Sequence, residues 1–272
     1  GLFGAPRMGI AGAAVATVMG QIIAGIFCIV INQAKNKEIN CSFKGFRPNR
    51  VTIGRIYKVG VPSIIMQSIG SVMTLGFNAI LMQFTSTAVS VFGIYFKLQS
   101  FIFMPVFGLN NGMIPIIAYN YGARNKKRIM DTMKFSIGTA VGLMLVGLVI
   151  LQLFPSRLLA MFNASEEMFK IGVPALRTIS LSFLFAGYCI IVGSVFQALG
   201  NGVYSLINSV VRQLLVLLPV AYVFAKLFGL SAVWFSFPIA ELASVVLSSY
   251  YLKKMYDDVI KPLGQKDKNV EN

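Results

Sequence analysis

Seven long apolar stretches alternate with short connections in this chain, and its Lys and Arg residues concentrate in every second connection. The stretches are residues 9–32, 59–83, 90–119, 135–153, 173–198, 205–228 and 231–252. A helix of roughly 20 apolar residues crosses the hydrocarbon core of a bilayer. The pattern therefore predicts an all-α polytopic membrane protein with about seven transmembrane helices.

The composition supports a membrane location. Of the 272 residues, 56% are hydrophobic and 12% are charged, whereas soluble domains carry about 25% charged residues. In a soluble protein, the formal net charge of +15 would indicate nucleic-acid binding. Because these charges lie in short loops beside apolar stretches, we expect membrane lipids with anionic head groups as partners, and no nucleic acid.

The basic residues also predict an orientation. Seventeen Lys and Arg residues fall within 33–58, 121–134 and 253–272, against four in the connections of the opposite face. Cytoplasmic loops carry an excess of Lys and Arg. We therefore expect a multi-pass protein of the cell (plasma or inner) membrane with a cytoplasmic C-terminus and an external N-terminal end.

Two observations indicate that the chain is a fragment. An odd number of spans with an external N-terminal end and no signal pattern is uncommon for a complete chain. The first and last spans are also weakly alike, for example at Gly9-Ile10 and Gly229-Leu230. Because internal repeats are common in transporters, we expect that the first span closes one half of a longer protein and that five upstream spans are missing.

Enzyme chemistry finds little support in the sequence. Histidine is absent, and the three cysteines show neither a disulfide framework nor metal-ligand spacing. No phosphate-binding glycine loop of the ATPase type occurs. We therefore expect no enzyme, no catalytic residue, no cofactor and no metal site, and any active transport would need an ion gradient.

The second apolar stretch carries polar side chains on one face. At 100° per residue, five of them fall within an arc of about 80°. They are Ser63, Gln67, Ser71, Thr74 and Asn78. This face predicts a helix that lines a wet cavity, and the alternative is polar contact between helices, worth about 0.6 kcal/mol per hydrogen bond.

Four full charges lie within the predicted spans. They are Lys97, Arg177, Arg212 and Glu241. Arg177 is close enough to a span end to extend to the interface, whereas a charge deeper in hydrocarbon needs a partner. We hypothesise that Glu241 pairs with Lys97 or Arg212, either to set helix order or to take part in ion coupling.

Proline and glycine add two local expectations. Pro219 frees the carbonyl of Leu215, on the same face as Asn208 and Arg212, which predicts a broken helix beside a charge or a kink that shapes packing. The motifs Gly108-x-x-x-Gly112 and Gly138-x-x-x-Gly142 predict close helix contacts.

Two segments carry motifs of a known family, Gly93-Ile94-Tyr95-Phe96-Lys97-Leu98-Gln99 and Ala118-Tyr119-Asn120-Tyr121-Gly122-Ala123-Arg124. They resemble the eighth helix and following loop of the multidrug and toxic compound extrusion (MATE) transporters, and most of all those of the bacterial multidrug-pump branch. Further similar segments are Phe196-Gln197-Ala198-Leu199-Gly200, Val211-Arg212-Gln213 with Pro219, and the opening at residues 9–17. The likeness covers the chain up to its tail.

The resemblance implies a twelve-helix fold in two lobes that exports organic cations in exchange for H⁺ or Na⁺ by alternating access. It identifies residues 1–32 as the last helix of the N-terminal lobe and 33–58 as a basic cytoplasmic linker. Residues 59–252 would form the six-helix C-terminal lobe, followed by a cytoplasmic tail at 253–272. The expected partners are small organic cations and the missing N-terminal lobe.

Site candidates follow from the polar face, the buried charges and the aromatic residues. The substrate or cavity candidates are Ser63, Gln67, Ser71, Thr74, Asn78, Asn111 and Tyr188. The intramembrane charge candidates are Lys97, Arg212 and Glu241.

The chain also departs from part of the family. Some branches carry an acidic ion ligand in helix seven, where this chain has only Gln67 and hydroxyl residues. In other branches the key carboxylate is in helix one, which would belong to the missing lobe. Two alternative functions stay open at this point, a lipid-linked saccharide flippase of the same superfamily and a seven-span receptor.

Overall fold

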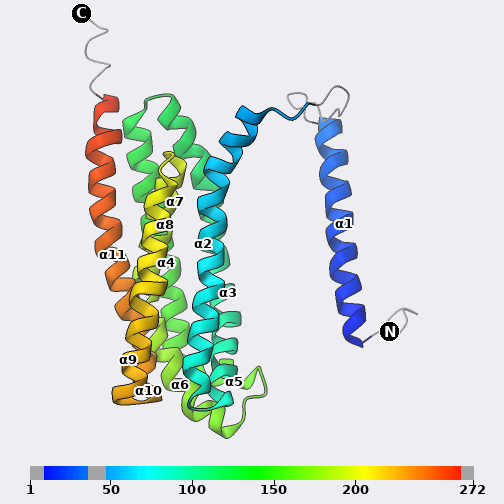
Figure 1. Ribbon diagram of the computed structural model, residues 1–272, viewed down its shortest axis with the longest axis vertical. Helices are drawn as coiled ribbons and strands as arrows, with labels where there is room; N and C mark the ends of the chain where they lie inside the picture. Colours follow the sequence, from blue (N-terminus) through cyan, green and yellow to red (C-terminus); the bar gives the residue numbers. More distant parts are fainter. Residues whose placement is uncertain (1–8, 36–46, 265–272) are drawn as a thin grey trace, which may run out of the picture. The chain divides into compact units, whose positions relative to one another are not determined.

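The computed structural model describes residues 9–35 and 47–264, and nearly all of them are helical (Figure 1). No β-strand occurs within these two ranges. Parts of the predicted linker 33–58 and of the tail 253–272 lie outside them. The chain divides into two compact units after Gly54, and each unit is described by itself.

The first unit contains helix α1 (Gly9–Lys35). Its large apolar side chains are exposed along the helix; the exposed fraction is 57% for Ile22 and 61% for Phe27. A helix that is apolar on all sides is typical of a membrane span or of a buried helix in a larger protein.

The second unit is a bundle of helices, and its first helix, α2, begins a few residues before the boundary. The helices are α2 (Arg50–Met82), α3 (Ser86–Gly122), α4 (Lys126–Leu153), α5 (Pro155–Ala160), α6 (Glu166–Ser180), α7 (Phe183–Ala198), α8 (Gly202–Val210), the π-helix η2 (Val211–Leu217), α9 (Leu218–Phe228), α10 (Leu230–Val233), α11 (Ser236–Met255), the π-helix η3 (Tyr256–Ile260) and the 3₁₀-helix η4 (Lys261–Gly264).

Six helical segments of the described chain are long and apolar enough to cross a membrane, and the pair α6–α7 makes a seventh if it is counted as one span. The all-α polytopic fold predicted from the sequence is therefore confirmed. The fifth predicted span, 173–198, differs in detail because α6 and α7 are bent by 49° relative to each other.

Side-chain hydrogen bonds explain where this bend lies. The hydroxyls of Ser180 and Ser182 donate to the carbonyls of Arg177 and Ile179, at 2.8 and 2.6 Å. Gln152 of α4 donates from Nε2 to the Arg177 carbonyl, also at 2.8 Å. Serine hydroxyls compete with the backbone for helical carbonyls, so α6 ends here with its carbonyls satisfied inside an apolar bundle.

Polar caps set the start of three long helices. The side-chain oxygens of Thr85, Asn125 and Ser165 accept from backbone N–H groups in the first turns of α3, α4 and α6. Such caps satisfy donors that have no partner within the helix. In addition, Thr87 donates to Glu167 Oε2 at 3.0 Å, which joins the starts of α3 and α6.

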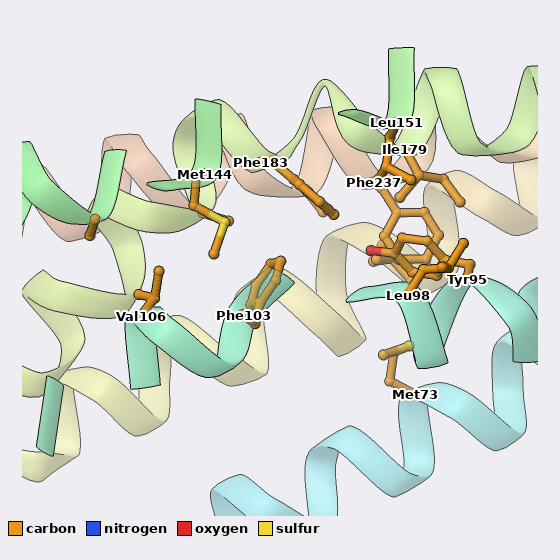
Figure 2. Packing of buried hydrophobic residues seen from close by; sticks show 14 of the residues in the cluster. Met73, Tyr95, Leu98, Phe103, Val106, Met144, Leu151, Ile179, Phe183 and Phe237 are labelled. Carbon is orange, nitrogen blue, oxygen red and sulfur yellow. The ribbon is translucent and has the colours of Figure 1, made fainter. Parts of the chain in front are cut away.

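Aromatic side chains hold α2, α3 and α11 together. The ring of Phe77 lies 4.6 Å from that of Phe92 and 5.1 Å from that of Phe237 between centroids. The ring of Tyr95 lies 5.8 Å from that of Phe237 between centroids, and elsewhere in the core that of Phe103 lies 5.1 Å from that of Phe183. All four side chains are labelled in Figure 2. Edge-on and tilted ring pairs at such distances are favourable.

The glycine contacts differ from the predicted ones. A Cβ atom at Gly108, Gly112, Gly138 or Gly142 would meet nothing within 4 Å among the described residues, so the predicted close contacts at these motifs are wrong there. Gly147 and Gly172 instead lie close to side chains of other helices, and Gly187 of α7 lies close to backbone, where a Cβ would be 3.0 Å from the Ala140 carbonyl oxygen of α4.

Candidate functional site

An ion pair within the bundle joins two of the charges singled out in the sequence. Arg212 Nη1 lies 2.5 Å from Glu241 Oε1, and the side chains are 29% and 11% exposed, respectively. Charge-assisted hydrogen bonds of this length are strong. Of the two partners hypothesised for Glu241, Lys97 and Arg212, the structure has Arg212.

The irregular backbone around Pro219 positions Arg212. Proline lacks an N–H, and its ring clashes with the carbonyl four residues earlier. The sequence predicts this disturbance at Leu215, and the structure has the π-helix η2 across it, at Val211–Leu217. A π-helix pairs residues five apart instead of four, and such segments are frequent at functional sites. Arg212 is the second residue of η2.

The ion pair is one contact in a row of polar contacts, which we call the polar seam. The seam consists of Ser205, Asn208 and Arg212 on α8–η2 and of Glu241, Ser244 and Ser248 on α11. Asn208 Nδ2 donates to Ser244 Oγ at 2.9 Å, and the Ser244 hydroxyl lies 3.2 Å from Asn208 Oδ1. Ser205 donates to the Gly193 carbonyl of α7 at 2.5 Å. The spacing of three and four residues keeps each set on one helix face.

Two atoms of the seam have no hydrogen-bond partner among the described residues, Ser248 Oγ and Glu241 Oε2. Glu241 is 8% exposed, and its Oε2 is buried without a hydrogen-bond partner among the described residues. Most buried polar atoms in proteins have at least one partner. Oε2 therefore retains an unused capacity to bind a ligand.

The predicted polar face of α2 is only partly covered. Gln67 and Ser71 are exposed, and the Thr74 hydroxyl donates to the Gly70 carbonyl of its own helix at 2.9 Å. Asn78 Oδ1 is buried without a partner in the described chain. Ser63 lies on α2, but its side chain is outside the described residues. The wet cavity beside this face stays a prediction.

The remaining candidates lie apart from the ion pair. Lys97 is exposed, with Nζ 5.7 Å from the ring centroid of Phe162. Asn111 is exposed on α3. Tyr188 of α7 shares a hydrogen bond with Ser249 of α11, with 2.9 Å between the two oxygens. The structure therefore does not gather all sequence-predicted residues into one site.

Sequence reasoning missed the serines of the seam. Ser244 and Ser248 are fully buried, and Ser205 is 3% exposed. The signal was available, because positions 241, 244 and 248 recur at helical spacing within an apolar stretch. Within the described residues, no group of three His, Cys, Asp or Glu residues is arranged to hold a metal ion.

The sequence matches known transporters over most of its length. The model of the MatE family matches residues 62–223. The multidrug export protein MepA of Staphylococcus haemolyticus is 28% identical over 244 residues, which are 90% of this chain and 54% of that protein. MepA of Staphylococcus saprophyticus is 30% identical over 86% of this chain and 51% of its own length. The chain thus spans about half the length of these relatives.

A solved structure has the same fold. It is the outward-facing conformation of a multidrug resistance MATE family transporter of the MOP superfamily. The TM-score is 0.84 at 22% sequence identity, and the match covers 95% of this chain and 58% of the other. At this identity the likeness concerns the fold alone.

Proposed function

Because the chain belongs to the MatE family, whose members are transporters and not enzymes, we propose that it is the C-terminal part of a cation-coupled exporter of organic cations. Transport is by alternating access and is driven by H⁺ or Na⁺. The observation that carries the proposal is the match between 90% of this chain and about half of a multidrug export protein. Membership in a family of transporters argues against the alternative that the chain is a seven-span receptor.

The proposal assigns the segments as the resemblance implies. Residues 1–32 contribute the last helix of the N-terminal lobe, 33–58 the linker, and 59–252 the C-terminal lobe, with the partner lobe upstream. The unit boundary after Gly54, within the proposed linker, supports this division. The solute passage then lies between the two lobes, as is common for transporters built from repeats.

Polar side chains of this lobe suit a passage for cations. Gln67 and Ser71 are exposed on α2, and Asn111 is exposed on α3, where polar groups facing lipid would be costly. These residues, with Thr74, Asn78 and Tyr188, are the proposed cavity lining. Within the predicted spans, the only acidic residue is Glu241.

The proposed environment is the cell membrane, with 33–58, 121–134 and the C-terminus in the cytoplasm. The support is the concentration of basic residues in these segments. Such segments also attract anionic lipids, at about 1 kcal/mol per Lys or Arg near the surface.

Transport by the full-length protein in lipid vesicles tests the proposal. A fluorescent organic cation is followed under an H⁺ gradient, under a Na⁺ gradient and under neither, with protein-free vesicles as the control. We expect the organic cation to move in the direction opposite to that in which H⁺ or Na⁺ flows down its gradient. Movement that ignores both gradients contradicts the antiport mechanism, and binding without movement favours a receptor.

A further inference from the structure

We propose that Glu241 is the proton-binding carboxyl of the transporter and that its protonation releases Arg212. The inference rests on the proposed function, because it names the coupling ion and the residue that binds it. It is carried by the geometry of the polar seam.

The two oxygens of the carboxyl group have different surroundings. Oε1 accepts from Arg212 Nη1, whereas Oε2 is buried and lacks a partner among the described residues. An unsatisfied charged oxygen in an apolar interior is costly, and a proton on that oxygen removes the charge. Oε2 is therefore the atom on which an added proton is best accommodated.

The surroundings favour a proton over a metal cation. Hard cations are held by several oxygen ligands, but Ser244, the nearest hydroxyl along the same helix face, is already bonded to Asn208. The guanidinium group of Arg212 lies directly beside the carboxyl and repels a second cation. A large organic cation does not reach a buried oxygen, whereas a proton does.

Within residues 9–35 and 47–264, no other carboxyl group is paired with Arg212. The titratable groups that interact electrostatically with Glu241 are Arg212 from η2, Tyr95 from α3 and Cys189 from α7. Lys97, also on α3, lies over the ring of Phe162 instead. Among these groups, Glu241 is the one in which protonation converts a carboxylate into a neutral carboxylic acid.

Protonation of Glu241 changes the surroundings of Arg212. A proton from water binds Oε2, the carboxylate becomes a neutral acid, and Arg212 keeps its charge without a counter-charge. The ionised carboxylate attracts the guanidinium group and the neutral acid does not, so the two states of Glu241 favour different positions of the Arg212 side chain. The Arg212 side chain is 29% exposed, against 11% for Glu241, so Arg212 is the partner with more room to move away from the pair.

The test uses the full-length protein and the variant Glu241→Gln, with Glu166→Gln as the matched control because Glu166 is an exposed carboxylate on α6. Infrared difference spectra between acid and neutral pH report carboxyl protonation. We expect a buried carboxylic-acid band in the wild type and in Glu166→Gln, its loss in Glu241→Gln and a shifted band in Glu241→Asp. An unchanged band in Glu241→Gln overturns the proposal.

A second readout connects the proton to the substrate. A pH-sensitive dye measures protons released when a fluorescent organic cation binds to detergent-solubilised protein, at fixed pH and with Na⁺ present or absent. We expect Glu241→Gln to release one proton fewer than the wild type, with no effect of Na⁺. Equal release, or release that Na⁺ replaces, overturns the proposal.

The double variant Arg212→Gln with Glu241→Gln covers the case in which the single variant does not fold. Two amides retain a hydrogen bond between η2 and α11 without any charge. We expect this variant to fold and to lack both the infrared band and the released proton. Proton-coupled transport by the double variant means that the pair is structural only and overturns the proposal. A wild type that moves no organic cation contradicts the proposed function, whereas the infrared band still tests Glu241 directly.

Discussion

Asn208 of α8 and Ser244 of α11 bond to each other one helical turn from the ion pair, with 2.9 Å between Asn208 Nδ2 and Ser244 Oγ. Asn208 is 7% exposed and Ser244 is fully buried. The Asn208 amide and the Ser244 hydroxyl therefore satisfy each other inside the apolar bundle. The contact also holds the two helices in the register that places Arg212 opposite Glu241.

A double-mutant cycle at Asn208 and Ser244 measures this contact. We expect Asn208→Ala and Ser244→Ala to be non-additive by about 0.6 kcal/mol, the average for hydrogen bonds between membrane helices. The measurement is the free energy of unfolding in detergent or bilayers. The control combines Asn208→Ala with Ser90→Ala, because the Ser90 hydroxyl bonds within its own helix, to Ser86. This control should be additive, and additivity at Ser244 would contradict the seam contact.

Gly187 predicts a second effect on stability. In Gly187→Ala the new methyl group lies 3.0 Å from the Ala140 carbonyl oxygen, and backbone cannot move aside as a flexible side chain can. We expect a loss of roughly 1–3 kcal/mol from overpacking, seen as a lower thermal midpoint in detergent. Gly142→Ala is the control, since its methyl group meets nothing within 4 Å among the described residues. An equal midpoint for both variants would refute the close approach of α4 and α7.

The aromatic core predicts a difference between two phenylalanines. Phe77 is fully buried among rings, whereas Phe101 is 74% exposed. Phe77→Ala leaves a cavity, and we expect it to cost on the order of 2 kcal/mol, because the packing loss remains even when unfolded helices stay in lipid. Phe101→Ala should change the unfolding free energy by less than that. A larger loss at Phe101 in the full-length protein would mean that this side chain packs against segments beyond the bundle.

The basic loops predict accessibility in intact cells. In a full-length protein without its native cysteines, we expect Lys127→Cys to be protected from a membrane-impermeant thiol reagent and Glu166→Cys to react. Lys127 is the second residue of α4, in the basic segment 121–134, whereas Glu166 begins α6, in a segment with few basic residues. Permeabilised cells provide the control, because both positions should then react. Labelling of Lys127→Cys in intact cells contradicts the orientation.

The sequence predicts the membrane spans well, because each needs a long apolar stretch, and this property is local. The bend within the fifth span was not predicted, because Ser180 and Ser182 on either side of Leu181 are single serines, which are common in membrane helices. The bend depends on Gln152 of α4, which bonds the carbonyl at Arg177 from another helix. Such a contact between distant segments leaves no periodic signal.

The candidate site was predicted only in part, because it too depends on contacts between distant segments. The cost of a buried charge indicates that Glu241 needs a partner, but Lys97 and Arg212 satisfy this requirement equally in sequence. Only the packing of η2 against α11 brings Arg212 into contact. Ser205, Ser244 and Ser248 were missed because single serines are common in membrane helices and carry little information one at a time. The segment boundaries and the polar face of α2 stay predictions.

The wide π-helical turn that carries Arg212 gives the lobe an internal joint. A segment with an additional residue per turn can pass that residue along the chain, as one carbonyl after another changes its partner from five residues away to four. Each such step shifts the residue that it passes by one position, which corresponds to a rotation of about 100° in an α-helix. The side chain of Arg212 can therefore change the helix face on which it lies while the helix stays continuous on both sides of η2.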